Sequence, residues 1–176
     1  TKYYGTTPLR SSFLEEVYKL PKGKIEYLEM GLDDSLINNL SNHKEQKKNL
    51  LESYKIPIAN KMIATGGKID SLKNIHLLID LFLDGKISGA TLFVFGTFSH
   101  ELEYYKEKIN KSENIIYLGW LSPQEILEIL SMSDLVVFPG THAVLGEQVV
   151  ALGIPVIVKY WKGMSHVNMG RNCKVL

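Results

Sequence analysis

The sequence is poor in three features, and each shortage removes a class of protein from consideration. A single cysteine, Cys173, leaves no internal disulfide framework and no cysteine-based zinc site, and it favours a reducing, cytoplasmic setting. The 20 basic and 19 acidic residues nearly cancel, which argues against a non-specific nucleic-acid binder. No apolar run approaches the ~20 residues that a membrane helix needs.

What the sequence does contain, from residue 61 onward, is a regular alternation of two kinds of segment. Short apolar runs rich in β-branched and aromatic residues predict strands at 61–67, 90–96, 114–120, 134–140 and 154–160. Segments with helical periodicity separate them, at 71–85, 99–110, 122–133 and 144–153. Strands that are apolar on both faces and alternate with helices indicate an α/β fold. We therefore expect a Rossmann-like parallel sheet with helices on both faces.

The helices carry recognisable start signals and apolar faces. Ser99 and Ser122 stand where N-caps are expected, and Pro123 occupies a first-turn position. The residues expected to face the core are Ile75, Leu78, Ile79 and Phe82 in one helix and Ile126, Ile129 and Leu130 in another.

Residues 1–60 are less regular than the rest. A helix is expected within 10–21, a strand within 24–31 and a charged amphipathic helix within 42–57. We interpret 1–60 as a segment that connects to an N-terminal half outside this sequence. Residues 61–176 are interpreted as the α/β domain, truncated at its C-terminal end.

Ligands bind parallel α/β sheets where strands turn into helices, so the turns hold the candidate site residues. In "GGKIDSLKN" (66–74), Gly67 leaves the backbone accessible, and Lys68 and Lys73 stand five apart around a helix start. Exposed amides, a helix N-terminus and two cations suit a diphosphate. The alternative is that both lysines are ordinary solvated surface residues. The segment is neither a P-loop nor a G-x-G-x-x-G fingerprint.

A second turn, "LGWLSP" (118–123), offers an apolar platform. Gly119 ends a strand, and Trp120 and Leu121 follow it, where a flat ligand could stack. Simple packing of the loop explains these residues equally well.

The third turn, "FPGTHAVLGEQ" (138–148), places polar groups directly after a buried strand. Gly140 allows the turn, and Thr141 and His142 then lie at the mouth of the sheet. Glu147 falls near the start of the next helix, where a carboxylate is tolerated by the helix dipole and could accept hydrogen bonds from a ribose diol. The alternatives are a capping or core histidine and a carboxylate kept by the dipole alone.

Other catalytic patterns are missing from the sequence. The five histidines form no H-E-x-x-H pair, so no metal is expected, and no G-x-S-x-G elbow supports a serine nucleophile. His166 and Asn168, after the last predicted strand, are further candidates for the same mouth.

The order of these elements resembles a known family. The segments "ATGGKIDSLKNIHLLIDLF", "IIYLGWLSPQEILEILSMSDLVVFPG" and "EQVVALGIPVIV" resemble the C-terminal, donor-binding half of GT-B nucleotide-sugar glycosyltransferases. The likeness is to the family 4-type group called glycosyl transferases group 1, and "PGTHAVLGEQ" and "KYWKGMSHV" resemble a bacterial subgroup associated with surface polysaccharides. The resemblance spans residues 61–160.

The resemblance implies a role for each turn. Lys68, where the family usually has arginine, and Lys73 match the positions that hold the donor diphosphate. The loop of Gly119, Trp120 and Leu121 matches the one that lines the nucleobase.

The family's last motif fits less well. It is a pair of glutamates eight residues apart, the second of them five residues before the glycine of Gly-x-Pro. The matching positions here hold Gly140 and Gln148, and Glu147 is one residue off, an offset of about 100° around a helix. We expect Glu147 rather than Gln148 to meet the ribose, and His142 to replace the first glutamate at the donor sugar.

The implied activity is transfer of a hexose from a UDP- or GDP-sugar to an acceptor hydroxyl, with retention, in polysaccharide or lipopolysaccharide synthesis. The implied substrates are a nucleotide-sugar donor and a sugar or lipid-linked acceptor bound through the N-terminal half. Peripheral membrane association would suit such an acceptor, and no cofactor is implied. We expect the isolated chain to bind nucleotide without turnover. The alternatives are half of a GT-B nucleotide-sugar 2-epimerase and a non-enzymatic α/β module of flavodoxin or receiver type.

Overall fold

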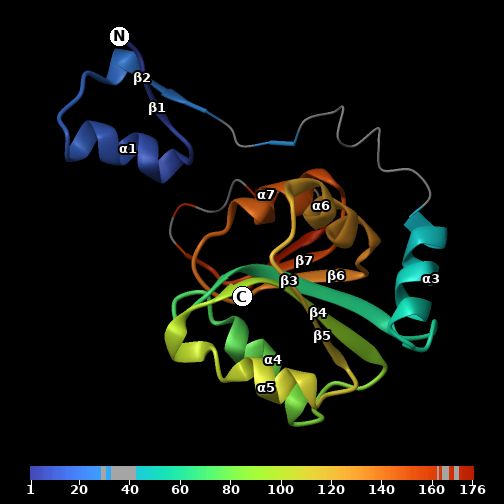
Figure 1. The fold of residues 1–176 in the computed structure, drawn as a ribbon. Helices are drawn as coiled ribbons and strands as arrows, with labels where there is room; N and C mark the ends of the chain where they lie inside the picture. The colour runs from blue at the N-terminus through green and yellow to red at the C-terminus, as the bar shows by residue number, and fades with distance from the viewer. Residues whose placement is uncertain (29–30, 33–42, 162, 164–166, 169–170) are drawn as a thin grey trace.

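The centre of the molecule is a parallel sheet of six strands in the order β5-β4-β3-β6-β7-β8 (Figure 1). The computed structural model describes residues 1–28, 31–32, 43–161, 163, 167–168 and 171–176. The strands are β3 (Lys61–Ile69), β4 (Ala90–Phe98), β5 (Ile115–Gly119), β6 (Leu135–Phe138), β7 (Val156–Val158) and β8 (Cys173–Val175). The five predicted strands are confirmed. The sequence analysis did not predict β8, because its residues, Cys-Lys-Val, form no continuous apolar run.

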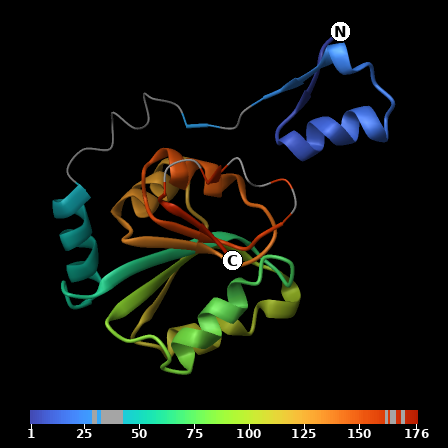
Figure 2. The same cartoon turned by 180° about the vertical axis from the view of Figure 1, so that it is seen from behind.

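Helices cover both faces of this sheet, as predicted (Figures 1 and 2). On one face lie α4 (Ile75–Leu83) and α5 (Tyr105–Asn110). On the other lie α3 (His43–Ser53), α6 (Pro123–Met132) and α7 (Val144–Ala151). Within the described residues, no helix has the length and apolarity required to cross a bilayer.

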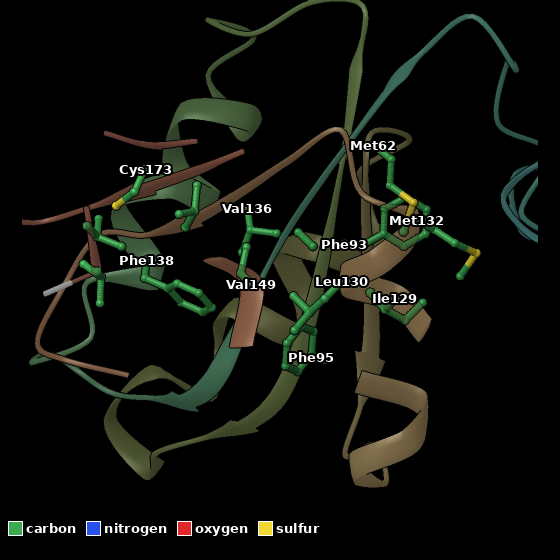
Figure 3. Packing of buried hydrophobic residues seen from close by; sticks show 14 of the residues in the cluster. Met62, Phe93, Phe95, Ile129, Leu130, Met132, Val136, Phe138, Val149 and Cys173 are labelled. Atoms are coloured by element: carbon green, nitrogen blue, oxygen red, sulfur yellow. The ribbon is translucent and has the colours of Figure 1, made fainter. Parts of the chain in front are cut away.

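Two hydrophobic cores, one on each face, hold the layers together. Successive residues of a strand point to opposite faces, and β4 supplies both cores in this way. Phe93 and Phe95 pack with α6 residues such as Leu130 (Figure 3). Leu92 and Val94 pack on the other face. Burying one such side chain contributes about 1.5–3 kcal/mol, so the apolar character of both strand faces is what fixes the three-layer arrangement.

The helix starts follow the sequence in one case and depart from it in another. Ser122 caps α6: its hydroxyl accepts from the backbone N–H of Glu125, and the Glu125 carboxylate accepts from the N–H of Ser122. Ser99 was expected to cap a helix in the same way, and this prediction is wrong. Its hydroxyl instead donates to the carbonyl of Ile69, and the chain passes through a 3₁₀ turn, η2 (His100–Leu102), before α5.

The N-terminal residues form a small βαβ unit (Figure 1). Strands β1 (Tyr3–Gly5) and β2 (Ile25–Tyr27) pair in parallel, with α1 (Pro8–Glu16) and the 3₁₀ turn η1 (Lys22–Lys24) between them. The helix expected within 10–21 and the strand expected within 24–31 correspond to α1 and β2. The sequence analysis did not predict β1.

Helix α3 is joined to the sheet by a partly buried polar contact. Lys47 forms an ion pair of 2.6 Å with Asp134, which also accepts the backbone N–H of Met62 at 2.7 Å. Burial acts to raise the pKa of Asp134, but Lys47 and the Met62 N–H outweigh it, and the pKa lies below its ordinary value. The charged helix therefore packs on α6 as part of the α/β unit.

The carboxyl ends of β3 and β4 approach each other more closely than side chains would permit. Gly67 and Gly96 are partners in the ladder and have φ angles of +113° and +110°. A Cβ atom on Gly96 would overlap with the carbonyl oxygen of Gly67. Only glycine fits this conformation and this spacing.

We predict that Gly96→Ala lowers the free energy of unfolding by at least ~3 kcal/mol, because the overlap adds to backbone strain. Urea denaturation measures the loss. Gly89→Ala is the matched control: its φ is +69°, but a Cβ there meets no atom within 4 Å. Strain alone should cost it about 1–2 kcal/mol. Equal losses in the two variants would contradict the close approach of β3 and β4.

Candidate functional site

The turn after β3 and the turn after β6 are joined backbone to backbone. The N–H of Thr141 donates to the carbonyl of Leu72 at 3.0 Å, and the side-chain amide of Asn74 donates to the carbonyl of Pro139 at 3.3 Å. A Cβ atom on Gly140 would overlap with the backbone of Lys73. The sequence predicted Gly140 as a turn residue, and the structure shows that it is also the point of contact between the two turns.

Asp70 organises the first of these turns. One carboxylate oxygen accepts the backbone N–H groups of Leu72 and Lys73, at 3.1 and 3.0 Å, and the other lies 3.2 Å from the ammonium of Lys68. Burial acts to raise the pKa of Asp70, but these hydrogen bonds and the charge of Lys68 outweigh it and lower the pKa. The sequence analysis missed Asp70. An aspartate three residues before a helix-start lysine is a recognisable turn signal.

The two predicted lysines are both at this end of the sheet, in different surroundings. Lys73 reaches across the junction and donates to the carbonyls of Thr141, at 3.1 Å, and His142. Desolvation by burial lowers the pKa of Lys73. Lys68 is largely exposed, with 72% of its side chain accessible, and pairs with Asp70. An ammonium has three donors, and these carbonyls take two of those on Lys73.

The structure brings His142 and Glu147 into direct contact. His142 Nε2 lies 2.6 Å from Glu147 Oε1; the His142 side chain is partly buried, with 15% exposed, and the Glu147 side chain is buried, with 5% exposed. Glu147 is in the first turn of α7, which begins after the extended residue Ala143. Helical side chains lean toward the N-terminus, so Glu147 meets the loop that carries His142. The predicted pair therefore forms one unit.

The pair lines a small pocket with an interior volume of about 10 Å³, which is room for one water molecule or one hydroxyl group. Thr141, His142 and Glu147 line it, as do Lys159 and Trp161 after β7. The ring of Trp161 lies 5.0 Å from that of His142, centroid to centroid. Among the described residues, no acceptor reaches the buried indole N–H of Trp161. The sequence analysis missed Trp161, because nothing in the motif order singles it out.

Other predicted residues lie apart from the pocket. Of the alternatives Glu147 and Gln148, Glu147 lines it. Gly119, with a φ of +70°, ends the outermost strand β5, and Trp120 after it is 81% exposed. Strands β4 and β3 separate this platform from β6.

Of the two candidates after the last predicted strand, His166 lies outside the described residues, and Asn168 is exposed. No group of three His, Cys, Asp or Glu residues that could hold a metal ion occurs in the part of the chain that the structure describes.

Comparisons with known proteins agree with this architecture. The sequence profile of the family described as Glycosyl transferases group 1 matches residues 46–172. No curated protein sequence matches the chain.

Several solved structures share the fold. A glycosyltransferase from Rickettsia africae superposes with a TM-score of 0.76 at 17% identity, over 100% of this chain and 49% of its own. WaaG, a glycosyltransferase involved in lipopolysaccharide biosynthesis, gives 0.75 at 18%, with the same coverage. HepE from Anabaena, in complex with UDP and glucose, gives 0.76 at 17%, over 99% of this chain and 49% of its own. This chain spans about half the length of each.

The Asp70 turn leads to a prediction about pH. Asp70→Ala should lower the free energy of unfolding at pH 7 by about 1–2 kcal/mol, because two backbone N–H groups lose their acceptor. The folded-state pKa is depressed, so this stabilisation is present above the unfolded pKa of about 3.9 and is lost as pH falls through the lower folded value. The gap between wild type and variant should therefore narrow below about pH 4.

Urea denaturation across pH 3–7 measures this gap. Asp84→Ala is the control, since Asp84 is 54% exposed and its ion-pair partner, Lys86, is exposed as well. It should change stability by less than about 0.5 kcal/mol. A gap for Asp70→Ala that is constant with pH would exclude the charged carboxylate as the stabilising group.

Proposed function

Because this chain belongs to the glycosyl transferases group 1 family, we propose that it is the donor-binding part of a glycosyltransferase. In this proposal a nucleoside-diphosphate sugar binds at the carboxyl ends of the sheet strands, and its sugar passes to an acceptor hydroxyl. The single observation that carries the proposal is the junction of the β3–α4 and β6–α7 turns, which puts Lys73, His142 and Glu147 at one place.

The diphosphate is assigned to the turn from Gly67 to Lys73. Lys68 and Lys73 supply two cations, and the N-terminus of α4 adds a favourable dipole. Asp70 offsets one of these charges, but it also holds the turn in shape. As the sugar leaves, negative charge develops on the diphosphate, and the two ammonium groups stabilise it without a metal ion.

The sugar and the ribose are assigned to the mouth of the pocket beside this turn. Its polar lining includes Thr141, His142 and Glu147, together with one cation, Lys159. A carboxylate that is 5% exposed accepts hydrogen bonds from hydroxyl groups and repels phosphate. Gly140 lies in the loop that carries Thr141 and His142, and Gln148 lies in α7 next to Glu147. The backbone of each supports this arrangement.

The base is assigned to the platform of Gly119, Trp120 and Leu121, where an exposed indole offers a stacking surface. The structural neighbour HepE has been solved with UDP-glucose, which supports a UDP-sugar as the first donor to test. The neighbour WaaG acts in lipopolysaccharide biosynthesis, and we propose a comparable polysaccharide product here. A lipid-linked acceptor would place the reaction at the cytoplasmic membrane face. Retention at the anomeric carbon remains part of the proposal.

Calorimetric titration with UDP, GDP and ADP, with and without EDTA, tests nucleotide binding. One nucleotide should bind in the presence of EDTA, and Lys73→Ala and Glu147→Ala should each weaken it about 10- to 100-fold. This is the range expected for losing a hydrogen bond to a charged group. Lys86→Ala is the control, because Lys86 is exposed and lies beyond the far end of α4. Failure of all three nucleotides to bind would overturn the proposal.

The chain spans about half of its structural neighbours, so we also propose that it binds donor without transferring sugar. Incubation with UDP-glucose, or with the glucose donor of the nucleotide selected by titration, should release no nucleoside diphosphate above background. Steady release with formation of a glycoside would show that these 176 residues suffice for turnover.

A further inference from the structure

The indole N–H of Trp161 has no hydrogen-bond acceptor in the part of the chain that the structure describes. It is also shielded from water. A donor buried in this way has given up its hydrogen bond to water without replacement, which is unfavourable for the folded state. Trp161 lines the pocket beside His142 and Glu147, so a ligand in that pocket is a ready source of the acceptor.

The groups around Trp161 restrict what this ligand can be. The imidazole of His142 contacts two neighbours: its ring is 5.0 Å from the Trp161 ring, and its Nε2 is 2.6 Å from Glu147 Oε1. The indole N–H can only donate, and an ionised carboxylate can only accept. The pocket therefore has a donor and an acceptor that both adjoin one histidine.

A hydroxyl group matches both neighbours, because it accepts one hydrogen bond and donates another. A phosphate oxygen would also satisfy the indole, and the exposed ammonium of Lys159 at the same pocket would attract it, but the carboxylate of Glu147, with 5% of its side chain exposed, would repel it. An ammonium would satisfy Glu147 and leave the indole without an acceptor. A hydroxyl is therefore the group that satisfies the indole and Glu147 together.

We propose that Trp161 is a positioning residue of the donor site and that its indole N–H donates to a hydroxyl of the bound nucleotide sugar, beside Glu147. The proposal rests on the function proposed above and adds a residue to it. Two rings of the donor carry suitable hydroxyls, the ribose and the transferred sugar. The indole N–H could donate to a hydroxyl of either ring, and binding measurements distinguish the ribose from the transferred sugar.

The test compares Trp161→Phe with wild type by calorimetry, using UDP and UDP-glucose or the equivalent pair for the nucleotide that the chain selects. Phenylalanine keeps an aromatic ring beside His142 and removes only the N–H donor and part of the ring. Affinity should fall about 3- to 10-fold, as for one neutral hydrogen bond. Equal loss for both ligands assigns the hydroxyl to the ribose, and a loss confined to UDP-glucose assigns it to the sugar. Unchanged affinity for both overturns the inference.

Tyr105→Phe is the matched control. It also removes a buried aromatic donor, the hydroxyl that donates to Asp80 at 2.7 Å, but it lies in the core on the opposite face of the sheet. Its ligand affinities should equal those of wild type. Urea denaturation of both variants establishes that each is folded under the titration conditions.

Nuclear magnetic resonance provides a second readout that does not depend on a variant's stability. The chain has two tryptophans, so a ¹⁵N–¹H spectrum shows two indole signals, and Trp161→Phe identifies one of them. Saturation of the wild type with UDP-glucose should move the Trp161 indole proton downfield as it gains an acceptor. A signal that stays in place at saturation overturns the inference and leaves the proposed function intact. Absence of any nucleotide binding by wild type overturns both.

Discussion

The contact between Gly140 and the backbone of Leu72 and Lys73 is the constraint on which the site depends. Two turns that follow different strands can share hydrogen bonds only if their backbones approach directly, and a Cβ atom at position 140 would prevent this. The approach puts the N–H of Thr141 on the carbonyl of Leu72. Lys73 and His142 then take their positions from this junction, because Lys73 extends from one turn and His142 from the other.

The electrostatics of the site follow from how these turns satisfy their own backbone. Asp70 accepts two N–H groups at the start of the β3–α4 turn, while Lys73 donates to two carbonyls of the β6–α7 turn. The charged residues therefore have structural partners as well as a proposed ligand. Burial at the junction lowers the pKa of Lys73. The site still presents positive charge, because Lys68 is exposed.

The pocket beyond the junction has a different character. Glu147 and Trp161 come from α7 and from the residues after β7, and both contact His142. The positive charge that suits a diphosphate is thus found at the end of β3. The hydrogen-bond donors and acceptors that suit hydroxyl groups are found at the ends of β6 and β7. The strand order separates these two kinds of chemistry, and a nucleotide sugar contains both.

The sequence by itself determined the α/β architecture, because strands such as β4 carry apolar residues on both faces and are therefore buried on both. Periodicity likewise identified the core face of α4, and Ser122 marked the start of α6. Local signals did not reveal Asp70 or Trp161, nor that Ser99 would donate to Ile69 instead of capping a helix. These roles depend on partners that are distant in the sequence or on burial by other elements. Only the tertiary structure, by packing the ends of β3, β6 and β7 side by side, decided which polar groups share one pocket.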